Sequence, residues 1–147
     1  MVLSQELKDE IQTAYSTWLA SHELKARYGQ RLMIAEVAKT LGRIQLGSDD
    51  QRMGDPAICV VEAGTGTGKT IAYAVAALPI AKALGKKLVV ATATVALQEQ
   101  IVYRDFPDIQ QRSGLDFKFS LAKGRSRYMC LSKLDGLLSA VHKLLHH

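Results

Sequence analysis

One eight-residue segment, Ala63-Gly-Thr-Gly-Thr-Gly-Lys-Thr70, has the residue types and spacing needed to bind phosphate. Its glycines let the backbone curl so that N–H groups point at anionic oxygens, and a helix that starts at its end adds a positive dipole. In such a loop Lys69 reaches the β- and γ-phosphates, and the Thr70 hydroxyl is a ligand for Mg²⁺. We therefore expect ATP and Mg²⁺ here, with Lys69 and Thr70 in the catalytic roles. The alternative is a purely structural glycine turn. The expected contacts are Ala63, Gly64, Thr65, Gly66, Thr67, Gly68, Lys69 and Thr70.

The hydrophobic pattern predicts helices and buried strands around this loop. Apolar residues recur at helical spacing over residues 3–24, with Ser4 as N-cap, and over residues 30–41, with Gly42 closing the helix. Further helices are expected over residues 69–84 and 95–103, the latter ending before Phe106-Pro107. Short β-branched or apolar runs predict strands at 57–61, 88–91 and, more weakly, 117–121. Alternating strands and helices predict an α/β fold with a parallel sheet.

Composition excludes several classes of protein. Hydrophobic residues are 48% and charged residues 22% of the 147 residues, so the chain has enough apolar surface to fold. No apolar run is long enough to span a membrane, and the first ten residues do not resemble a signal peptide. Cys59 and Cys130, far apart and without a leader, fit a reducing cytoplasm.

The charge is unevenly divided along the chain. Residues 1–62 carry seven basic and nine acidic side chains, whereas residues 63–147 carry twelve basic and five acidic ones. This excess suggests a polyanionic partner for the second half, or else acidic partners elsewhere in a larger protein. Within residues 117–134 basic and aromatic residues interleave, as in sites for single-stranded nucleic acid. Phe117 and Phe119 alternate, which is more typical of a packed core.

Three motifs occur in the order found in superfamily 2 helicases. Arg27-Tyr-Gly-Gln30 resembles their Q motif, in which a Gln matches the N6 and N7 edge of adenine; a solvated polar helix face is the alternative. The phosphate loop follows, and then residues 91–101 resemble motif Ia, which grips DNA phosphates. Thr92 and Thr94 are the expected DNA contacts, with Gln98 a weaker candidate; capping of the next helix by Thr94 is the alternative.

The resemblance extends to iron–sulfur helicases of the XPD and DinG type. Gly124-Arg-Ser-Arg-Tyr-Met-Cys130 is similar to the segment that supplies the first cysteine of their [4Fe-4S] cluster. Such a cluster needs four thiolates, and this chain holds two cysteines. Cys59 lies in an apolar run and is expected to be a buried, inert thiol. Lys123, Arg125 and Arg127 are expected to face DNA.

The resemblance implies an ATP-dependent DNA helicase that moves 5′ to 3′ on single-stranded DNA and acts in DNA repair. It predicts a P-loop NTPase (RecA-like) parallel sheet flanked by helices, incomplete here and preceded by an N-terminal helical segment. The predicted parts are a helical segment with the Q motif (1–46), a partial first motor domain (47–122) and the start of a truncated iron–sulfur region (123–147). The chain is expected to be monomeric and cytoplasmic.

One motif of these helicases is missing from the sequence. They hold Mg²⁺ and orient water with an Asp-Glu-x-His motif after an apolar strand, whereas the one Asp-Glu pair here, Asp9-Glu10, precedes the phosphate loop. We therefore expect an N-terminal fragment that binds ATP weakly and hardly hydrolyses it, ended by an early stop, a shifted frame or a chosen boundary. The alternative is a stand-alone ATP-binding regulatory module without catalysis.

Overall fold

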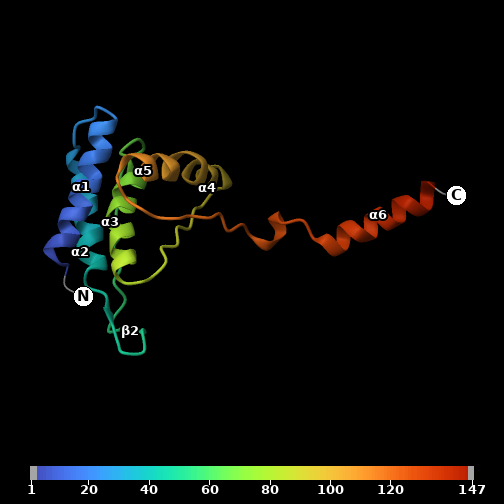
Figure 1. The fold of residues 1–147 in the computed structure, drawn as a ribbon, viewed down its shortest axis with the longest axis horizontal. Coiled ribbons are helices and arrows are strands. Elements are labelled where there is room, and N and C mark those ends of the chain that lie inside the picture. Colours follow the sequence, from blue (N-terminus) through green and yellow to red (C-terminus); the bar gives the residue numbers. More distant parts are fainter. Residues whose placement is uncertain (1–2, 146–147) are drawn as a thin grey trace.

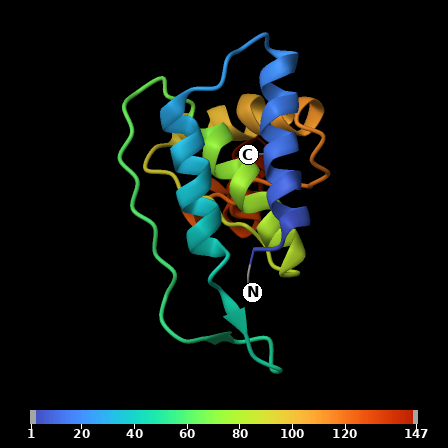
Figure 2. The same ribbon diagram turned by 90° about the vertical axis from the view of Figure 1, so that its left-hand side faces the viewer.

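The centre of the fold is the apolar helix α3 (Lys69–Ala83), which packs against α1 (Gln5–Ser21) and α2 (Tyr28–Leu41). The computed structural model describes residues 3–145, apart from the side chains of residues 140 and 142–145, so residues 146–147 of the predicted third part lie outside it. Because α3 is apolar around most of its circumference, it needs cover on several sides. Figure 2 shows α1 and α2 flanking it. Three of its alanines, Ala72, Ala74 and Ala76, are fully buried and permit close approach.

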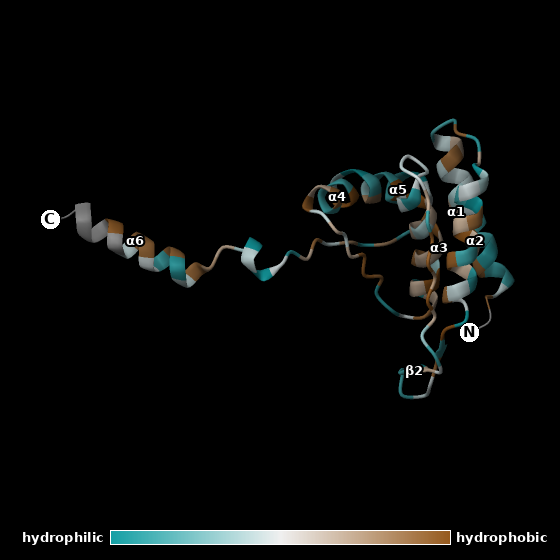
Figure 3. Cartoon of the chain, turned by 180° about the vertical axis from the view of Figure 1, so that it is seen from behind, coloured by the Kyte–Doolittle hydropathy of each residue, from teal (hydrophilic) through white to brown (hydrophobic). Residues whose placement is uncertain are grey.

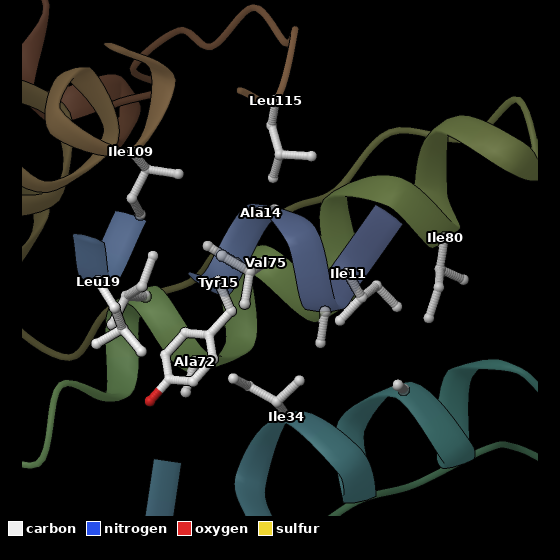
Figure 4. Close-up of a cluster of buried hydrophobic side chains, with 14 of the residues drawn as sticks. Ile11, Ala14, Tyr15, Leu19, Ile34, Ala72, Val75, Ile80, Ile109 and Leu115 are labelled. Atoms are coloured by element: carbon white, nitrogen blue, oxygen red, sulfur yellow. The ribbon is translucent and has the colours of Figure 1, made fainter. Parts of the chain in front are cut away.

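The two N-terminal helices confirm the predicted pattern. Ser4 caps α1, with its Oγ accepting a hydrogen bond from the Leu7 N–H at 3.3 Å. The helix then buries one face, formed by Leu7, Ile11, Ala14, Tyr15 and Leu19. Figure 4 shows several of these side chains in the core together with Ile34 of α2 and Ala72 of α3. Gly42 ends α2 as expected, although this helix begins at Tyr28, two residues before the predicted start.

The helix predicted to stop before Phe106-Pro107 continues past it, so that prediction was wrong. α4 (Val95–Gln100) leads into a π-helical turn, η1 (Ile101–Asp105), and then into α5 (Phe106–Arg112). Proline lacks a donor N–H, but the first turn of a helix leaves its N–H groups unpaired, so Pro107 is tolerated at the start of α5. α5 packs on α1.

The parallel sheet is not formed by the described residues. Their one sheet is a hairpin of β1 (Gln45–Leu46) and β2 (Arg52–Met53), antiparallel, with Gln45 opposite Met53. Residues 57–61, 88–91 and 117–121 are not in strands. Ile58, Val60 and Val89 are exposed to 75%, 92% and 85%, and Figure 3 shows apolar stretches of chain outside the helices.

The predicted strands do not form because a β-strand, unlike an α-helix, cannot pair its backbone hydrogen-bonding groups within itself. Its N–H and C=O groups need a neighbouring strand, and residues 57–61 and 88–91 have no such neighbour among the described residues. Cys59, expected to be buried within the first of these runs, is exposed for the same reason.

The last part of the chain leaves the helical body. Phe117 and Phe119 hold the start of this part by edge-to-face contacts with Phe106, at ring-centroid distances of 5.8 and 5.5 Å, which confirms their role in packing. A short 3-10 turn, η2 (Arg125–Arg127), and α6 (Leu131–Leu145) follow, and Figure 1 shows α6 standing apart from the other helices. Among the helices of residues 3–145, none is both long and apolar enough to cross a membrane.

Candidate nucleotide-binding site

The glycine-rich loop has the backbone conformation that its sequence predicts. Gly66 and Gly68 both have φ of +74°, in the left-handed region that favours glycine. Gly68 is the N-cap of α3, and no side chain caps the first turn of this helix. The first N–H groups of α3 therefore face the loop without a side-chain acceptor, as an anion site requires. Thr65 lies exposed in the turn.

Lys69 folds back over the loop that precedes it. Its ammonium group donates to the carbonyl oxygens of Ala63 at 2.8 Å and Gly64 at 2.9 Å, while the Thr67 hydroxyl donates to the same Gly64 oxygen at 2.8 Å. These bonds concentrate the positive charge of Lys69 inside the loop, where phosphate oxygens would compete for it.

Thr70 is half-buried in the first turn of α3. One turn further along lies Tyr73, and burial raises the pKa of its phenol, an effect that a hydrogen bond to Thr70 partly offsets. The phenol therefore stays neutral and protonated beside Thr70 at neutral pH.

Arg27 and Gln30, distant in sequence from the loop, both lie against it. Arg27 donates from Nη1 to the Gly66 carbonyl oxygen at 2.9 Å. Gln30 is 6% exposed, so its interpretation as part of a solvated helix face was wrong. A side chain at position 68 would clash with Gln30 Nε2, which places the amide directly over the loop's last glycine.

The residues predicted to form motif Ia make hydrogen bonds to groups outside the phosphate loop. Thr94 caps α4, accepting from the Leu97 N–H at 3.2 Å, as the capping alternative expected. Thr92 donates to the Thr94 carbonyl oxygen at 3.1 Å, and Gln98 donates to the Ala122 carbonyl oxygen at 3.3 Å. Within the described residues no hydrogen bond or ion pair joins residues 92–98 to the phosphate loop.

The basic segment, residues 117–134, is linked to α4 through one arginine. Arg127 donates from Nη1 to Gln98 Oε1 at 2.6 Å and lies 3.9 Å from the Glu99 carboxylate. Lys123 and Arg125 are exposed. Their charged groups make no hydrogen bond or ion pair in the part of the chain that the structure describes, which leaves them available to a polyanion.

The cysteines do not form a metal site. Cys59 and Cys130 are both free and exposed, and the described residues contain no group of three or more potential metal ligands. Two thiols do not fit a [4Fe-4S] cluster, which needs four ligands.

One residue that contacts the candidate site, Tyr15, was not predicted from the sequence to do so. Tyr15 was expected only as part of the apolar face of α1, yet its hydroxyl donates to Gln30 Oε1 at 2.8 Å. The available signal was its hydroxyl, because a buried tyrosine usually pairs its O–H. The pattern could not indicate which residue would accept it.

Comparisons with known proteins show the family to which the chain belongs. Residues 43–145 match the family model described as DEAD/DEAH box helicase, which is more than half of the chain. That match includes the phosphate loop, motif Ia and the basic segment.

The chain is also similar to curated helicases over most of its length. It is 39% identical over 137 residues to the ATP-dependent DNA helicase DinG of Photobacterium profundum, covering 91% of this chain and 18% of the relative. It is 39% identical over 140 residues to the ATP-dependent DNA helicase DinG of Escherichia coli K12, covering 95% of this chain and 18% of the relative. The chain thus spans about a fifth of the length of these relatives.

Proposed function

Because the chain belongs to the DEAD/DEAH box helicase family, we propose that it is the nucleotide-binding part of a DinG-type ATP-dependent DNA helicase. The observation that carries this proposal is the convergence of Arg27 and Gln30 on the phosphate loop across more than thirty residues of sequence. A structural glycine turn gives no reason for that convergence. Family membership implies the P-loop NTPase fold and the use of ATP and Mg²⁺.

Each residue of the site would contact a different part of the bound nucleotide. Lys69 would exchange its carbonyl partners for the β- and γ-phosphates, and the backbone N–H groups from Gly64 to Thr70 would surround the phosphates. The Thr70 hydroxyl would hold Mg²⁺. Arg27 would keep the loop in shape through Gly66, and Gln30 would recognise the adenine edge.

DNA would be held on the side of the chain formed by motif Ia and the basic segment. Thr92, Thr94 and Gln98 supply hydroxyl and amide groups, and the hydrogen bond from Arg127 to Gln98 joins the two regions. Lys123 and Arg125 add exposed positive charge for phosphates. Single-stranded DNA, 5′-to-3′ movement, DNA repair, a monomeric state and a cytoplasmic location belong to this proposal through the resemblance.

In this proposal the chain has the three parts predicted from its sequence. Residues 1–46 carry the Q motif, residues 47–122 carry part of the first motor domain, and residues 123–147 begin the iron–sulfur region. We propose that the unpaired runs 57–61 and 88–91 join strands from elsewhere in a longer protein. Cys130 would be one cluster ligand there, with three thiolates supplied from outside this sequence.

The test is nucleotide binding and hydrolysis by the 147-residue chain. A fluorescent ATP analogue should bind in the presence of Mg²⁺, and Lys69→Ala should weaken binding at least tenfold. Lys86→Ala, which removes a lysine outside the loop, is the matched control and should bind as the parent does. Because the sequence has no Asp-Glu-x-His motif after a strand, turnover should stay near background. Single-stranded DNA that stimulates a Lys69-dependent ATPase would contradict the incomplete-motor proposal.

A further inference from the structure

A long apolar groove runs between α1 and α2. Figure 2 shows the two helices side by side with α3 behind them, and no residue of α3 is among the described residues that line the groove. Its volume is about 1080 Å³. Both helices contribute apolar residues to it, namely Ile11, Tyr15 and Leu19 of α1 and Ile34 and Ala38 of α2. The two helices therefore present an apolar surface on the side that α3 does not cover.

The groove is elongated and open, which fits a helix better than a small molecule. Its lining residues extend along α1 from Lys8 to Leu19, about 17 Å at 1.5 Å per residue. Gln12, Ser16 and Ala35 line it and are exposed, so the groove is open to solvent. Pockets for small ligands enclose most of the ligand's surface, whereas a helix in a groove buries one apolar face and leaves the other in water.

The charged residues that line the groove are all basic. Residues 1–62 carry seven basic and nine acidic side chains. Among the described residues, four of the seven basic side chains line the groove and none of the acidic ones does; the four are Lys8, Arg31, Lys39 and Arg43. Glu36 lies 3.9 Å from Lys39, but the charged groups of the other three make no hydrogen bond or ion pair within residues 3–145. A segment of the chain that is acidic in total thus has unpaired positive charge along this groove.

The lining residues favour a polypeptide over a nucleic acid. Single-stranded nucleic acid binds where its bases stack on aromatic rings. The one aromatic residue among the described lining residues is Tyr15, which is 7% exposed and whose hydroxyl is bound to Gln30. Aliphatic side chains with basic neighbours match instead a helix that has aliphatic side chains on one face and carboxylates beside them.

Charge and position both indicate that the occupant comes from another protein. The helix α6 stands apart from the helical body, but it carries two lysines and one aspartate, so its charge does not complement the groove. Apart from Arg43 and Gln45, the lining residues precede residue 43, where the match to the helicase family model begins. The groove is therefore an addition to the part of the chain that is shared with the family.

We infer that the groove between α1 and α2 is a docking surface for an acidic amphipathic helix of a partner protein. Aliphatic side chains of that helix would pack between Ile11 and Ile34. Its carboxylates would meet Lys8 on one edge and Arg31 and Lys39 on the other. The inference goes beyond the proposed function and does not depend on it, because no residue of the phosphate loop lines the groove.

The experiment measures binding of a fluorescently labelled peptide to the full 147-residue chain by anisotropy. The peptide is an amphipathic helix of about 18 residues, or five turns, with leucines at i, i+3, i+4 and i+7 and glutamates at the flanking positions. A matched peptide has lysines in place of the glutamates. The glutamate peptide should bind at least about tenfold more tightly than the lysine peptide, and added salt should weaken its binding. Equal affinities of the two peptides would contradict the inference.

Charge reversal at the groove edges tests where the peptide binds. The double variant Lys8→Glu with Lys39→Glu should weaken binding of the glutamate peptide at least about tenfold, because like charges would face each other. The double variant Lys25→Glu with Arg52→Glu is the matched control: it changes the net charge equally at exposed residues that do not line the groove. It should bind as the parent does. Equal weakening in both double variants would reflect net charge alone and overturn the inference.

A charge placed among the apolar lining residues tests the groove independently. Ala35→Glu introduces a carboxylate at an exposed residue of α2 that lines the groove, and it should weaken binding of the glutamate peptide at least as much as the charge reversal. Ala20→Glu, at an exposed residue of α1 outside the groove, is the control. Circular dichroism should show the parent's helix content in both, since neither site is buried. Unchanged peptide binding in Ala35→Glu would exclude the groove as the binding site.

Other occupants of the groove would give different results. A parent chain that dimerises in sedimentation velocity, and is monomeric as Ala35→Glu, would show that a second copy covers the groove. A charge-reversed groove that loses affinity for a single-stranded oligonucleotide but keeps the peptide would indicate a nucleic-acid surface. Either result, or no saturable binding of the glutamate peptide at millimolar concentration, overturns the inference. Failure to bind the ATP analogue would overturn the proposed function alone.

Discussion

The contact between Gly68 and Gln30 shows how single residues join the two halves of the candidate site. Gln30 Nε2 occupies the space that any side chain at position 68 would need. Gly68 also has a positive φ and is the N-cap of α3. Backbone conformation and side-chain space thus both require glycine here, whereas at Gly64 a Cβ would meet nothing within 4 Å and the φ is not in the left-handed region.

We predict that Gly68→Ala weakens both folding and nucleotide binding. The left-handed conformation costs alanine about 1–2 kcal/mol, and the clash displaces Gln30 from the loop. Urea denaturation should show a free energy of unfolding lower by at least that amount, and affinity for the ATP analogue should fall more than tenfold. Gly64→Ala is the control and should retain stability. Equal stability of the two variants would mean that Gln30 does not lie over the loop.

Among the elements, α5 is tied to α1 chiefly through the Asp108 carboxylate, and Arg112 Nη1 adds a hydrogen bond to the Ser21 carbonyl oxygen at 3.2 Å. Asp108 accepts from Trp18 Nε1 at 2.7 Å and from Arg112 Nε at 3.1 Å. The ring of His22 lies 3.1 Å from the same carboxylate. Because Trp18 and His22 belong to the last turn of α1 and the residue after it, Asp108 fixes where α5 docks on the helical body.

Asp108→Ala should therefore loosen α5 without unfolding α1. It leaves the Trp18 N–H without its partner, and we expect a loss of about 1–2 kcal/mol in the free energy of unfolding. Trp18 fluorescence should change, since its indole becomes more mobile. Asp116→Ala removes an exposed aspartate that has no partner in the described structure and should change neither. A similar loss of stability in both variants would point to net charge instead of this docking contact.

Helices and strands differ in how well they could be predicted from the sequence. The helices 5–21, 28–41 and 69–83 follow from spacing and caps because their hydrogen bonds are local. The loop conformation follows from its glycines for the same reason. The runs at 57–61 and 88–91 have the composition of buried strands, but pairing depends on residues far away in sequence. The link from Tyr15 to Gln30 was equally hidden, since it joins two helices whose relative placement no local pattern specifies.

At the scale of the whole molecule, apolar side chains are divided between a buried core and exposed extended segments. Ile80 of α3 is 1% exposed, whereas Ile58 is 75% exposed. Exposed contiguous apolar residues usually mark a surface that another part of a protein covers. The stability of this chain should accordingly come from its helices and very little from residues 57–61.

The same substitution at these two isoleucines tests that division. Ile80→Ala creates a cavity beside α1 and α2 and should cost about 2–5 kcal/mol, whereas Ile58→Ala removes exposed methyl groups and should change the free energy of unfolding by less than about 0.5 kcal/mol. Urea denaturation followed by circular dichroism measures both. A large loss in Ile58→Ala would show that the run is buried in solution, either by strand pairing within the chain or between two copies of it. Sedimentation velocity separates these cases, because pairing within the chain leaves the mass of a monomer.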